Sequence, residues 1–424
     1  MIVSLTLFLL LFILLGMPIA FSMGLAAVAA IVLDGSIPLI VLPQKMFSSL
    51  DSFPLLAIPL FILAGQVMNV SGITEGLIGL ARSLVGHMRG GMGQVTILTS
   101  LLFSTISGSA AASAAAVGGM LIPAMARDGF RREDAAVITA GAAILGPVIP
   151  PSVVMVIYGS MTGLSIGTLF LAGIGPGILI ALVLMAAVFH MAGRNLTRRH
   201  ARATWGECAR ALGEAVPALM MPAIIVGGIV SGLFTATEAG VVAVAYGALY
   251  ALITRRSDLA GLVENMTSAA VTSSSIMVIL GGASLFGWII AHEGVPAMIA
   301  AWLQGFTSSP FVVMLLVLAV LLLVGIFIEP IPAMVMLVPV LQPIGDVYGL
   351  EPYHFAMVVT FGLLLGSLTP PVAVLVLITC KIANVDYMRA NRPLIPIFVM
   401  MVVALVLIAF IPAITLVFPR WMAV

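Results

Sequence analysis

Charged residues are scarce in this chain. Only 8% of its 424 residues are Asp, Glu, Lys or Arg, whereas 62% are hydrophobic. Too few polar side chains remain to cover the surface of a soluble domain, so the composition excludes that class of protein. The chain also lacks the short alternating strands of an outer-membrane barrel, because its apolar runs have helical length. The sequence therefore predicts an all-α polytopic membrane protein.

Lysine and cysteine are nearly absent, and common catalytic motifs are missing. Lys45 and Lys381 are the only lysines, and neither follows a glycine-rich phosphate-binding loop, so ATP is not expected to drive the protein directly. Cys208 and Cys380 are too few for a disulfide framework. No HExxH, CxxC or clustered His and Asp pattern indicates a catalytic metal. We therefore expect no enzymatic activity, no organic cofactor and no nucleic-acid partner.

The distribution of arginine predicts which loops face the cytoplasm. Fifteen of the 17 basic residues are Arg, and five of these lie between Arg194 and Arg210. Under the positive-inside rule this stretch is a cytoplasmic loop. We interpret residues 193–214 as a basic cytoplasmic linker that joins two membrane units, residues 1–192 and 215–424.

Two proline-containing segments recur and indicate an internal repeat. Gly146-Pro147-Val148-Ile149-Pro150-Pro151-Ser152 reappears 220 residues later as Gly366-Ser367-Leu368-Thr369-Pro370-Pro371-Val372. Three glycines recur at offsets of 216 to 222, so that Gly16, Gly72 and Gly129 match Gly232, Gly294 and Gly349. Each double proline removes backbone donors within an apolar run. We therefore predict two broken helices, at residues 135–173 and 355–385.

Matched loops of the two copies differ in charge. The loops of the first copy carry Arg82, Arg89, Arg127, Arg131 and Arg132. The partner loops, residues 294–315 and 343–356, contain no Lys or Arg. The first set is therefore expected to face the cytoplasm and the second set to face outward. This arrangement is an inverted-topology repeat, which is typical of secondary transporters.

Two further segments are predicted to be re-entrant hairpins. Residues 93–125 have basic loops at both ends, so they enter and leave on the cytoplasmic side. Arms of about 14 to 16 residues reach roughly 21 to 24 Å, which is short of a hydrocarbon core of about 30 Å. The tip is Ser107-Gly108-Ser109. The counterpart is a periplasmic-side hairpin over residues 311–345, with its tip between Gly325 and Pro332.

The hairpin tips and helix breaks supply the candidate binding residues. They are expected to meet near the midplane, where half-helix N-termini suit an anion and free oxygens suit Na⁺. The candidate ligands are the carbonyls of Gly146, Pro147, Gly366 and Ser367, and the hydroxyls of Ser107, Ser109, Ser152 and Thr369. These neutral oxygens suit an alkali ion better than a transition metal. The alternative is that these small residues only allow close helix packing.

Two glutamates have several candidate roles. Glu329 lies at the second tip, where it would bind a cation, take a proton or cap the following half-helix. Glu238 lies at a turn between two spans, where a capping or interfacial role is expected. No arginine lies within a predicted crossing. An anionic substrate would therefore be held by helix ends and bound Na⁺.

Four motifs together resemble the large membrane subunit of tripartite ATP-independent periplasmic (TRAP) transporters. They are Ser107-Gly108-Ser109, the segment from Gly146 to Ser152, Phe234-Thr235-Ala236-Thr237-Glu238-Ala239, and Leu368-Thr369-Pro370-Pro371-Val372. The resemblance implies a multi-pass protein of the bacterial inner membrane that imports organic acids with Na⁺. It also implies two partners, a periplasmic solute-binding protein and a small four-helix membrane subunit. The implied fold is elevator-type, like the ion transporter superfamily, with a transport domain that bears both hairpins and moves against a scaffold.

The resemblance also assigns the Na⁺ sites to the spaces between each hairpin tip and the facing broken helix. The matching positions are Ser107, Ser109, Gly146, Pro150, Gly366, Thr369 and Pro370, and we add Gly108, Gly325 and Glu329 from the tips. Two features depart from the family pattern. The small subunit is not fused to this chain, and the turn reads Thr-Ala-Thr-Glu where Thr-Pro-Thr-Glu is expected.

The leading hypothesis is Na⁺-coupled import of a small carboxylate, such as a C4-dicarboxylate. The main alternative is a stand-alone dicarboxylate symporter coupled to Na⁺ or H⁺. An intramembrane hydrolase would need Ser107 or Ser109 as its nucleophile, although no histidine lies near them in sequence. A purely structural membrane subunit is the third alternative.

Overall fold

The computed structural model describes residues 1–192, 201–256, 258–370 and 372–422. Apart from turns, every element in these ranges is a helix, and nine helices are long and apolar enough to cross a membrane. The number becomes ten if the bent pair Arg132–Val148 and Val153–Thr162 is one span. The described residues therefore confirm a polytopic helical membrane protein. Residues 193–200 of the predicted linker, and Pro371, lie outside them.

The helices lie in two parts of the chain, before and after residue 200. The first part contains α1 (Ile2–Leu14), α2 (Ile19–Asp34), α3 (Val41–Leu50), η1 (Phe53–Leu56), α4 (Ala57–Val70), α5 (Ile73–Val85), α6 (Gly91–Ser107), α7 (Ala110–Arg127), α8 (Arg132–Ala143), α9 (Leu145–Val148), α10 (Val153–Thr162) and α11 (Ile166–Ala192). The second part contains α12 (Trp205–Val230), α13 (Ala236–Ile253), α14 (Leu259–His292), α15 (Val295–Phe306), α16 (Pro310–Phe327), α17 (Pro330–Val347), α18 (Pro352–Gly366), α19 (Val374–Ala383), α20 (Tyr387–Phe410) and α21 (Ala413–Trp421).

Glycines at matched positions of the two parts make the same kind of turn. All six have a positive φ: Gly16, Gly72 and Gly129 at +79°, +74° and +100°, and Gly232, Gly294 and Gly349 at +72°, +69° and +66°. Glycine enters this left-handed region without the strain that a Cβ causes. The recurring glycines therefore have a local physical reason, because each one ends or begins a helix.

The first predicted broken helix differs from the structure at its C-terminal end. α10 ends at Thr162, and the next residue, Gly163, is its C-cap with a φ of +72°. A left-handed glycine at this position is a common helix stop. α11 then begins at Ile166. The predicted range 135–173 therefore runs into the first turns of a separate helix.

Two short central helices are the most deeply buried. Residues 134–143 of α8 and 354–366 of α18 are all buried. Nearly all of these residues are small or apolar, on every side of the helix, which is expected of a helix surrounded by others. The polar exceptions are Asp134, Thr139, His354 and Thr360. α8 packs against α6, α7, α19 and α20, while α18 packs against α16, α17, α11 and α20. Each helical hairpin thus lies beside the helix that leads into a break.

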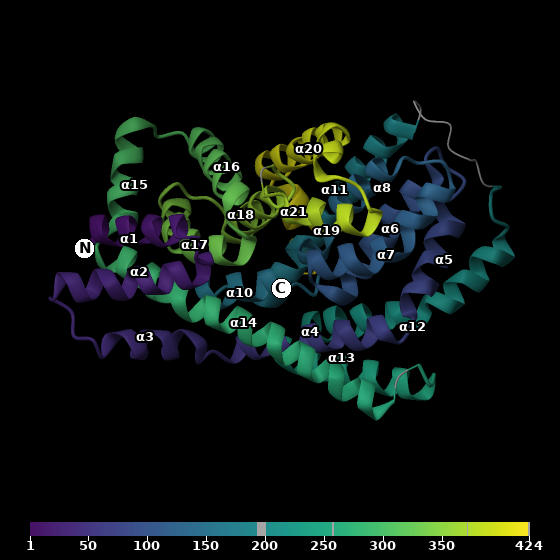
Figure 1. The fold of residues 1–424 in the computed structure, drawn as a ribbon, viewed down its shortest axis with the longest axis horizontal. Coiled ribbons are helices and arrows are strands. Elements are labelled where there is room, and N and C mark those ends of the chain that lie inside the picture. The colour runs from purple at the N-terminus through teal and green to yellow at the C-terminus, as the bar shows by residue number, and fades with distance from the viewer. Residues whose placement is uncertain (193–200, 257, 371, 423–424) are drawn as a thin grey trace.

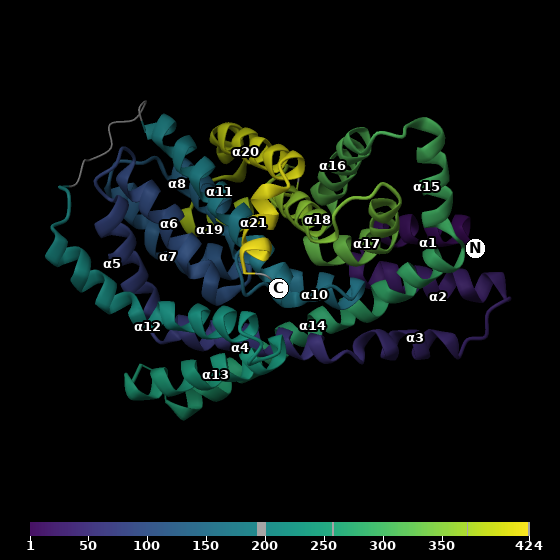
Figure 2. The same cartoon turned by 180° about the vertical axis from the view of Figure 1, so that it is seen from behind.

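A long helix crosses the molecule beneath this centre. α14 has 34 residues, which corresponds to about 50 Å at 1.5 Å per residue. It runs diagonally from α2 and α3 to α4 in Figure 1, and Figure 2 shows the same path from behind. Its length exceeds a hydrocarbon core of about 30 Å, so it must tilt or extend beyond it.

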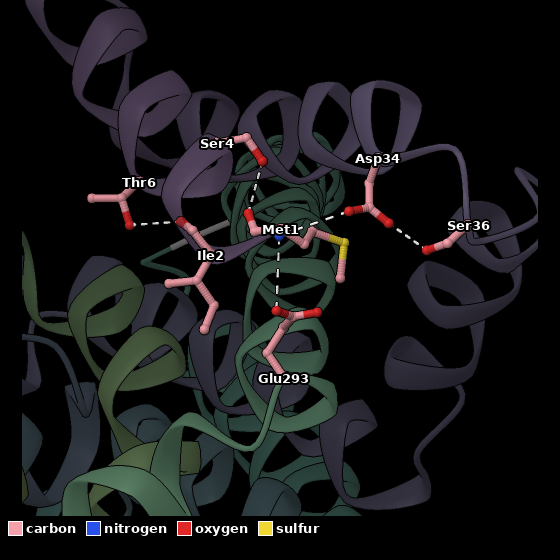
Figure 3. A network of polar contacts seen from close by, with 7 residues as sticks. All are labelled: Met1, Ile2, Ser4, Thr6, Asp34, Ser36 and Glu293. Atoms are coloured by element: carbon pink, nitrogen blue, oxygen red, sulfur yellow. Dashed lines mark hydrogen bonds and ion pairs between the residues drawn. The ribbon is translucent and has the colours of Figure 1, made fainter.

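A small ionic cluster joins three helix ends, including the end of α14 (Figure 3). The amino group of Met1 lies 3.7 Å from Asp34 and 3.8 Å from Glu293. Ser36 donates a hydrogen bond to Asp34. These contacts bring together the start of α1, the end of α2 and the turn after α14.

Candidate functional site

The first hairpin tip lies directly against the first helix break. α6 ends at Ser107, Gly108 turns the chain with a φ of +58°, and Ser109 begins α7. The Ser109 hydroxyl accepts a hydrogen bond from the N–H of Ala112 at 3.4 Å. A Cβ on Gly108 would lie 2.6 Å from the carbonyl oxygen of Pro151. Only glycine therefore fits both the backbone conformation and the available space.

The first break is a non-helical segment between α9 and α10. The axis bends by 40° there, and the Pro150–Pro151 peptide bond is cis. Ser152 caps α10, because its hydroxyl accepts from the N–H of Met155 at 3.3 Å and donates to the carbonyl of Pro147 at 2.5 Å. A Cβ on Gly146 would lie 2.7 Å from the carbonyl oxygen of Ser109. The tip and the break thus touch through backbone atoms.

The second tip and second break approach each other through paired glycines. A Cβ on Gly325 in α16 would lie 3.0 Å from the Cα of Gly366, where α18 ends. After Gly366 the chain makes a turn in which the N–H of Thr369 donates to the Gly366 carbonyl at 2.8 Å. The hydroxyl of Thr369 donates to the carbonyl of Leu365 at 3.2 Å. Pro370 follows in the same turn, and α19 begins at Val374.

Three of the four carbonyls that were expected to be unpaired accept hydrogen bonds. Pro147 accepts from the Ser152 hydroxyl, Gly366 accepts from the Thr369 N–H, and Ser367 accepts from the Leu375 N–H at 3.4 Å. The expectation of unpaired oxygens is therefore wrong for these three. These carbonyls find other donors nearby, because N–H groups of turns and a hydroxyl group replace the helical N–H donors that proline lacks. A carbonyl oxygen has two lone pairs, so each retains one acceptor position.

Both tips and both breaks line one central cavity of about 440 Å³. The expected site residues that line it are Ser107, Gly108, Ser109, Pro147, Glu329 and Ser367. The others do not line it but lie close by in sequence, in the breaks or in the helices that adjoin the tips and breaks: Gly146, Pro150, Ser152, Gly325, Gly366, Thr369 and Pro370. The tertiary structure therefore brings segments from both parts of the chain together at a single place.

Four helix N-termini also meet at this cavity. The first residues of α7, α10, α17 and α19 all line it, beginning with Ala110, Val153, Pro330 and Val374. N–H groups in a first helical turn have no partner within their own helix, and each N-terminus carries about half a positive charge. Among the described residues that line the cavity, Glu329 is the only charged side chain. The positive potential here comes from the backbone.

Glu329 does not cap the helix that follows it. It occupies the N-cap position of α17, but its side chain makes no capping hydrogen bond. Pro330 and Pro332 occupy two of the first three helical positions and have no N–H to donate. The side chain lines the cavity instead. Glu238, by contrast, forms a capping box with Thr235, since each side chain accepts from the backbone N–H of the other.

Two other helices, α4 and α14, contribute polar residues that the sequence analysis missed. Gln66 and Asn69 of α4 and Thr272 of α14 line the cavity. The Gln66 amide nitrogen donates to Ser268 at 3.3 Å, while its buried Oε1 has no hydrogen-bond partner among the described residues. A polar side chain within an apolar run was the signal that could have identified Gln66.

The cavity lacks the groups that serine hydrolysis needs. The Ser107 hydroxyl lies 3.0 Å from the hydroxyl of Ser113, which is not a base at neutral pH. No histidine or lysine is among the described residues that line the cavity. A serine nucleophile requires an adjacent general base.

Two helical hairpins that face two helix breaks across one cavity define a membrane transporter. The fold is similar to that of a solved structure titled "Crystal structure of the Alcanivorax borkumensis YdaH transporter reveals an unusual topology". The TM-score is 0.60 over 88% of each chain, with 14% identity. At this identity the likeness concerns the fold alone.

Sequence comparisons give the family. A family model described as "Tripartite ATP-independent periplasmic transporter, DctM component" matches residues 6–414. The chain is 36% identical over 406 residues to the sialic acid TRAP transporter large permease protein SiaM of Vibrio cholerae, covering 96% of this chain and 95% of that protein. It is 35% identical over 402 residues to the C4-dicarboxylate TRAP transporter large permease protein DctM of Pseudomonas aeruginosa, covering 95% and 94%. The chain therefore belongs to the family of TRAP transporter large permeases, which is a family of transporters rather than enzymes.

Proposed function

We propose that this chain is the subunit that moves substrate in a Na⁺-coupled importer of small carboxylates, with C4-dicarboxylates as the leading class. The observation that carries the proposal is the central cavity at which four helix N-termini meet. No lysine or arginine lies among the described residues that line it. A carboxylate would be recognised by backbone N–H groups.

The electrostatics of the cavity support an anionic substrate. A negative charge near a helix N-terminus is stabilised by roughly 0.3 to 1 kcal/mol at exposed sites, and by up to about 2 kcal/mol in partly buried ones. Several N-termini therefore supply an appreciable attraction without a fixed cationic side chain. A cavity of about 440 Å³ lies within the common size range of small-molecule sites.

The contacts between tips and breaks support Na⁺ as the coupling ion. The first candidate site lies between the tip residues Ser107 and Ser109 and the break residues Gly146 and Pro150. The second lies around Gly366, Thr369 and Pro370, beside the tip that contains Gly325. Their carbonyl and hydroxyl oxygens are hard, neutral ligands. Bound Na⁺ would offset the charge of Glu329 and that of the substrate.

The proposed partners follow from the tripartite family to which the chain belongs. One partner would be a small membrane subunit. We expect a periplasmic solute-binding protein to deliver the substrate at the inner membrane. The hairpins would then move as a transport domain against a scaffold that includes α14.

Reconstitution tests the coupling. Proteoliposomes that hold this chain and its small subunit, supplied with the binding protein, should take up a labelled C4-dicarboxylate when Na⁺ is high outside. Replacing the Na⁺ gradient with a K⁺ gradient should abolish the uptake. Equal uptake under both gradients would contradict Na⁺ coupling.

The same preparation distinguishes the stand-alone symporter. That alternative predicts uptake without the binding protein, whereas the tripartite proposal predicts uptake only when it is present. Uptake that is driven by a proton gradient in the absence of Na⁺ would identify H⁺ coupling. A panel of acids, including a sialic acid, would identify the substrate class.

A further inference from the structure

A second cavity lies apart from the proposed transport site. It is a groove of about 1250 Å³ between the start of α8, the end of α11 and the start of α20, and it shares no lining residue with the central cavity. These three helices lie side by side in both views and contact one another. α11 and α20 are candidate membrane spans, so the groove lies at the end of a membrane-embedded surface.

Arginines occupy one end of the groove. Arg131, Arg389 and Arg392 line it together with Glu133 and Asp134, which leaves a net charge of +1. Arg131 donates two hydrogen bonds of 2.8 Å to Asp134, and this contact raises the pKa of Arg131. Arg389 and Arg392 are exposed, and neither forms a salt bridge with another described residue. Two guanidinium groups are therefore available for an anion.

Apolar side chains form the wall beside these arginines. The wall includes Met191, Met388, Ile395, Pro396, Val399 and Met400. Ile395 and Val399 are 61% and 51% exposed. They follow Arg392 by three and seven residues, so they lie on the same helix face, roughly 4.5 and 10 Å further along the axis. The guanidinium group of Arg392 thus lies next to the exposed apolar side chains of Ile395 and Val399 on one face of α20.

The wall of α20 also supplies hydrogen-bond acceptors. Pro393 and Pro396 lie inside this helix and line the groove. Because proline has no N–H, the carbonyls of Arg389 and Arg392 lack the helical donor four residues on. The groove therefore combines guanidinium donors with backbone acceptors. This combination suits a headgroup that carries both a phosphate and hydroxyl groups.

We propose that this groove binds an anionic phospholipid, with its phosphate between Arg389 and Arg392 and an acyl chain along Ile395 and Val399. A soluble phosphate would gain nothing from the apolar wall, whereas a lipid uses both parts of the groove. The positive-inside rule assigns the arginine loops to the cytoplasmic side, where basic pockets between membrane helices bind anionic headgroups.

Native mass spectrometry of the full-length chain in detergent tests the proposal. Phosphatidylglycerol and phosphatidylcholine are titrated separately, and the bound fraction is measured. The wild type should bind phosphatidylglycerol more tightly. The double variant Arg389→Gln with Arg392→Gln should lose affinity by roughly fivefold per arginine, or about 25-fold in all. Arg82→Gln with Arg210→Gln is the matched control, since it removes two exposed arginines outside the groove and should bind as the wild type does.

Two further arms decide between a lipid and a free phosphate. Glycerol 3-phosphate, which carries the headgroup charge without chains, should not displace the lipid at equal concentration. Val399→Ser should weaken phosphatidylglycerol binding while it leaves the melting temperature without lipid unchanged. The proposal is overturned if both lipids bind equally, if the double variant binds like its control, or if glycerol 3-phosphate competes as well as the lipid.

Discussion

The contact between the first hairpin tip and the first helix break predicts a specific effect of Gly146→Ala. The added Cβ would lie 2.7 Å from the carbonyl oxygen of Ser109 and 2.8 Å from its carbonyl carbon. A Cβ atom essentially never comes within 3.0 Å of a heavy atom outside its own residue and its chain neighbours, and both obstructing atoms are backbone. The tip must therefore move away from the break by several tenths of an ångström.

The expected magnitude follows from two opposing terms. Overpacking a buried contact costs about 1 to 3 kcal/mol, while replacing a helical glycine by alanine stabilises by up to about 1 kcal/mol. With the middle of the first range, about 2 kcal/mol, the net loss is about 1 to 2 kcal/mol, which corresponds to a factor of roughly 5 to 30 in an equilibrium constant. If Na⁺ binds between tip and break, its half-saturating concentration for uptake should rise by this factor. The assay is initial uptake in proteoliposomes as a function of external Na⁺.

Gly119→Ala is the matched control for this prediction. Gly119 lies in α7 of the same hairpin, and a Cβ there would meet no heavy atom within 4 Å. This variant should keep the wild-type Na⁺ dependence and melting temperature. Identical Na⁺ half-saturation in the two variants, with both proteins folded, would refute the assignment of the ion to this junction.

Three other substitutions test the remaining parts of the site. Glu329→Gln should lower the KM for a carboxylate, because it removes the only charged side chain among the described residues that line the cavity. An unchanged or higher KM would favour a role in cation binding. Gln66→Leu should raise the KM of hydroxylated acids by roughly 5- to 100-fold and affect unsubstituted acids less, because only a hydroxyl donates to its unpaired Oε1; equal effects on both would contradict this role. Pro150→Ala with Pro151→Ala should return backbone donors to the first break and weaken the Na⁺ dependence of uptake, and an unaltered dependence would argue against a cation there.

The sequence indicated the position of each interruption because its causes are local. A proline removes a donor that its own helix needs, and a glycine with a positive φ ends a helix within one turn. The break at Pro150 and the tip at Gly108 therefore appear where the residues predict them. The predicted range 135–173 extends past the end of α10, because Gly163 ends that helix.

The composition and motifs also determined the class of protein. Apolar runs of helical length are stable inside a membrane, and the motifs of the tips and breaks together resemble those of TRAP large permeases. The family match over residues 6–414 confirms that resemblance. The family match does not identify the substrate, since relatives of similar identity are named for sialic acid and for C4-dicarboxylates. It does not identify the coupling ion either.

Only the tertiary structure decided what these local features do together. Gln66 and Thr272 reach the cavity from α4 and α14, which are far apart in sequence, and the Pro147 carbonyl is paired by the hydroxyl of Ser152. Periodicity within one helix cannot reveal which face meets a distant helix, because that choice depends on how all the helices pack. The chain by itself specified where its helices stop, and packing specified that four of their N-termini share one cavity.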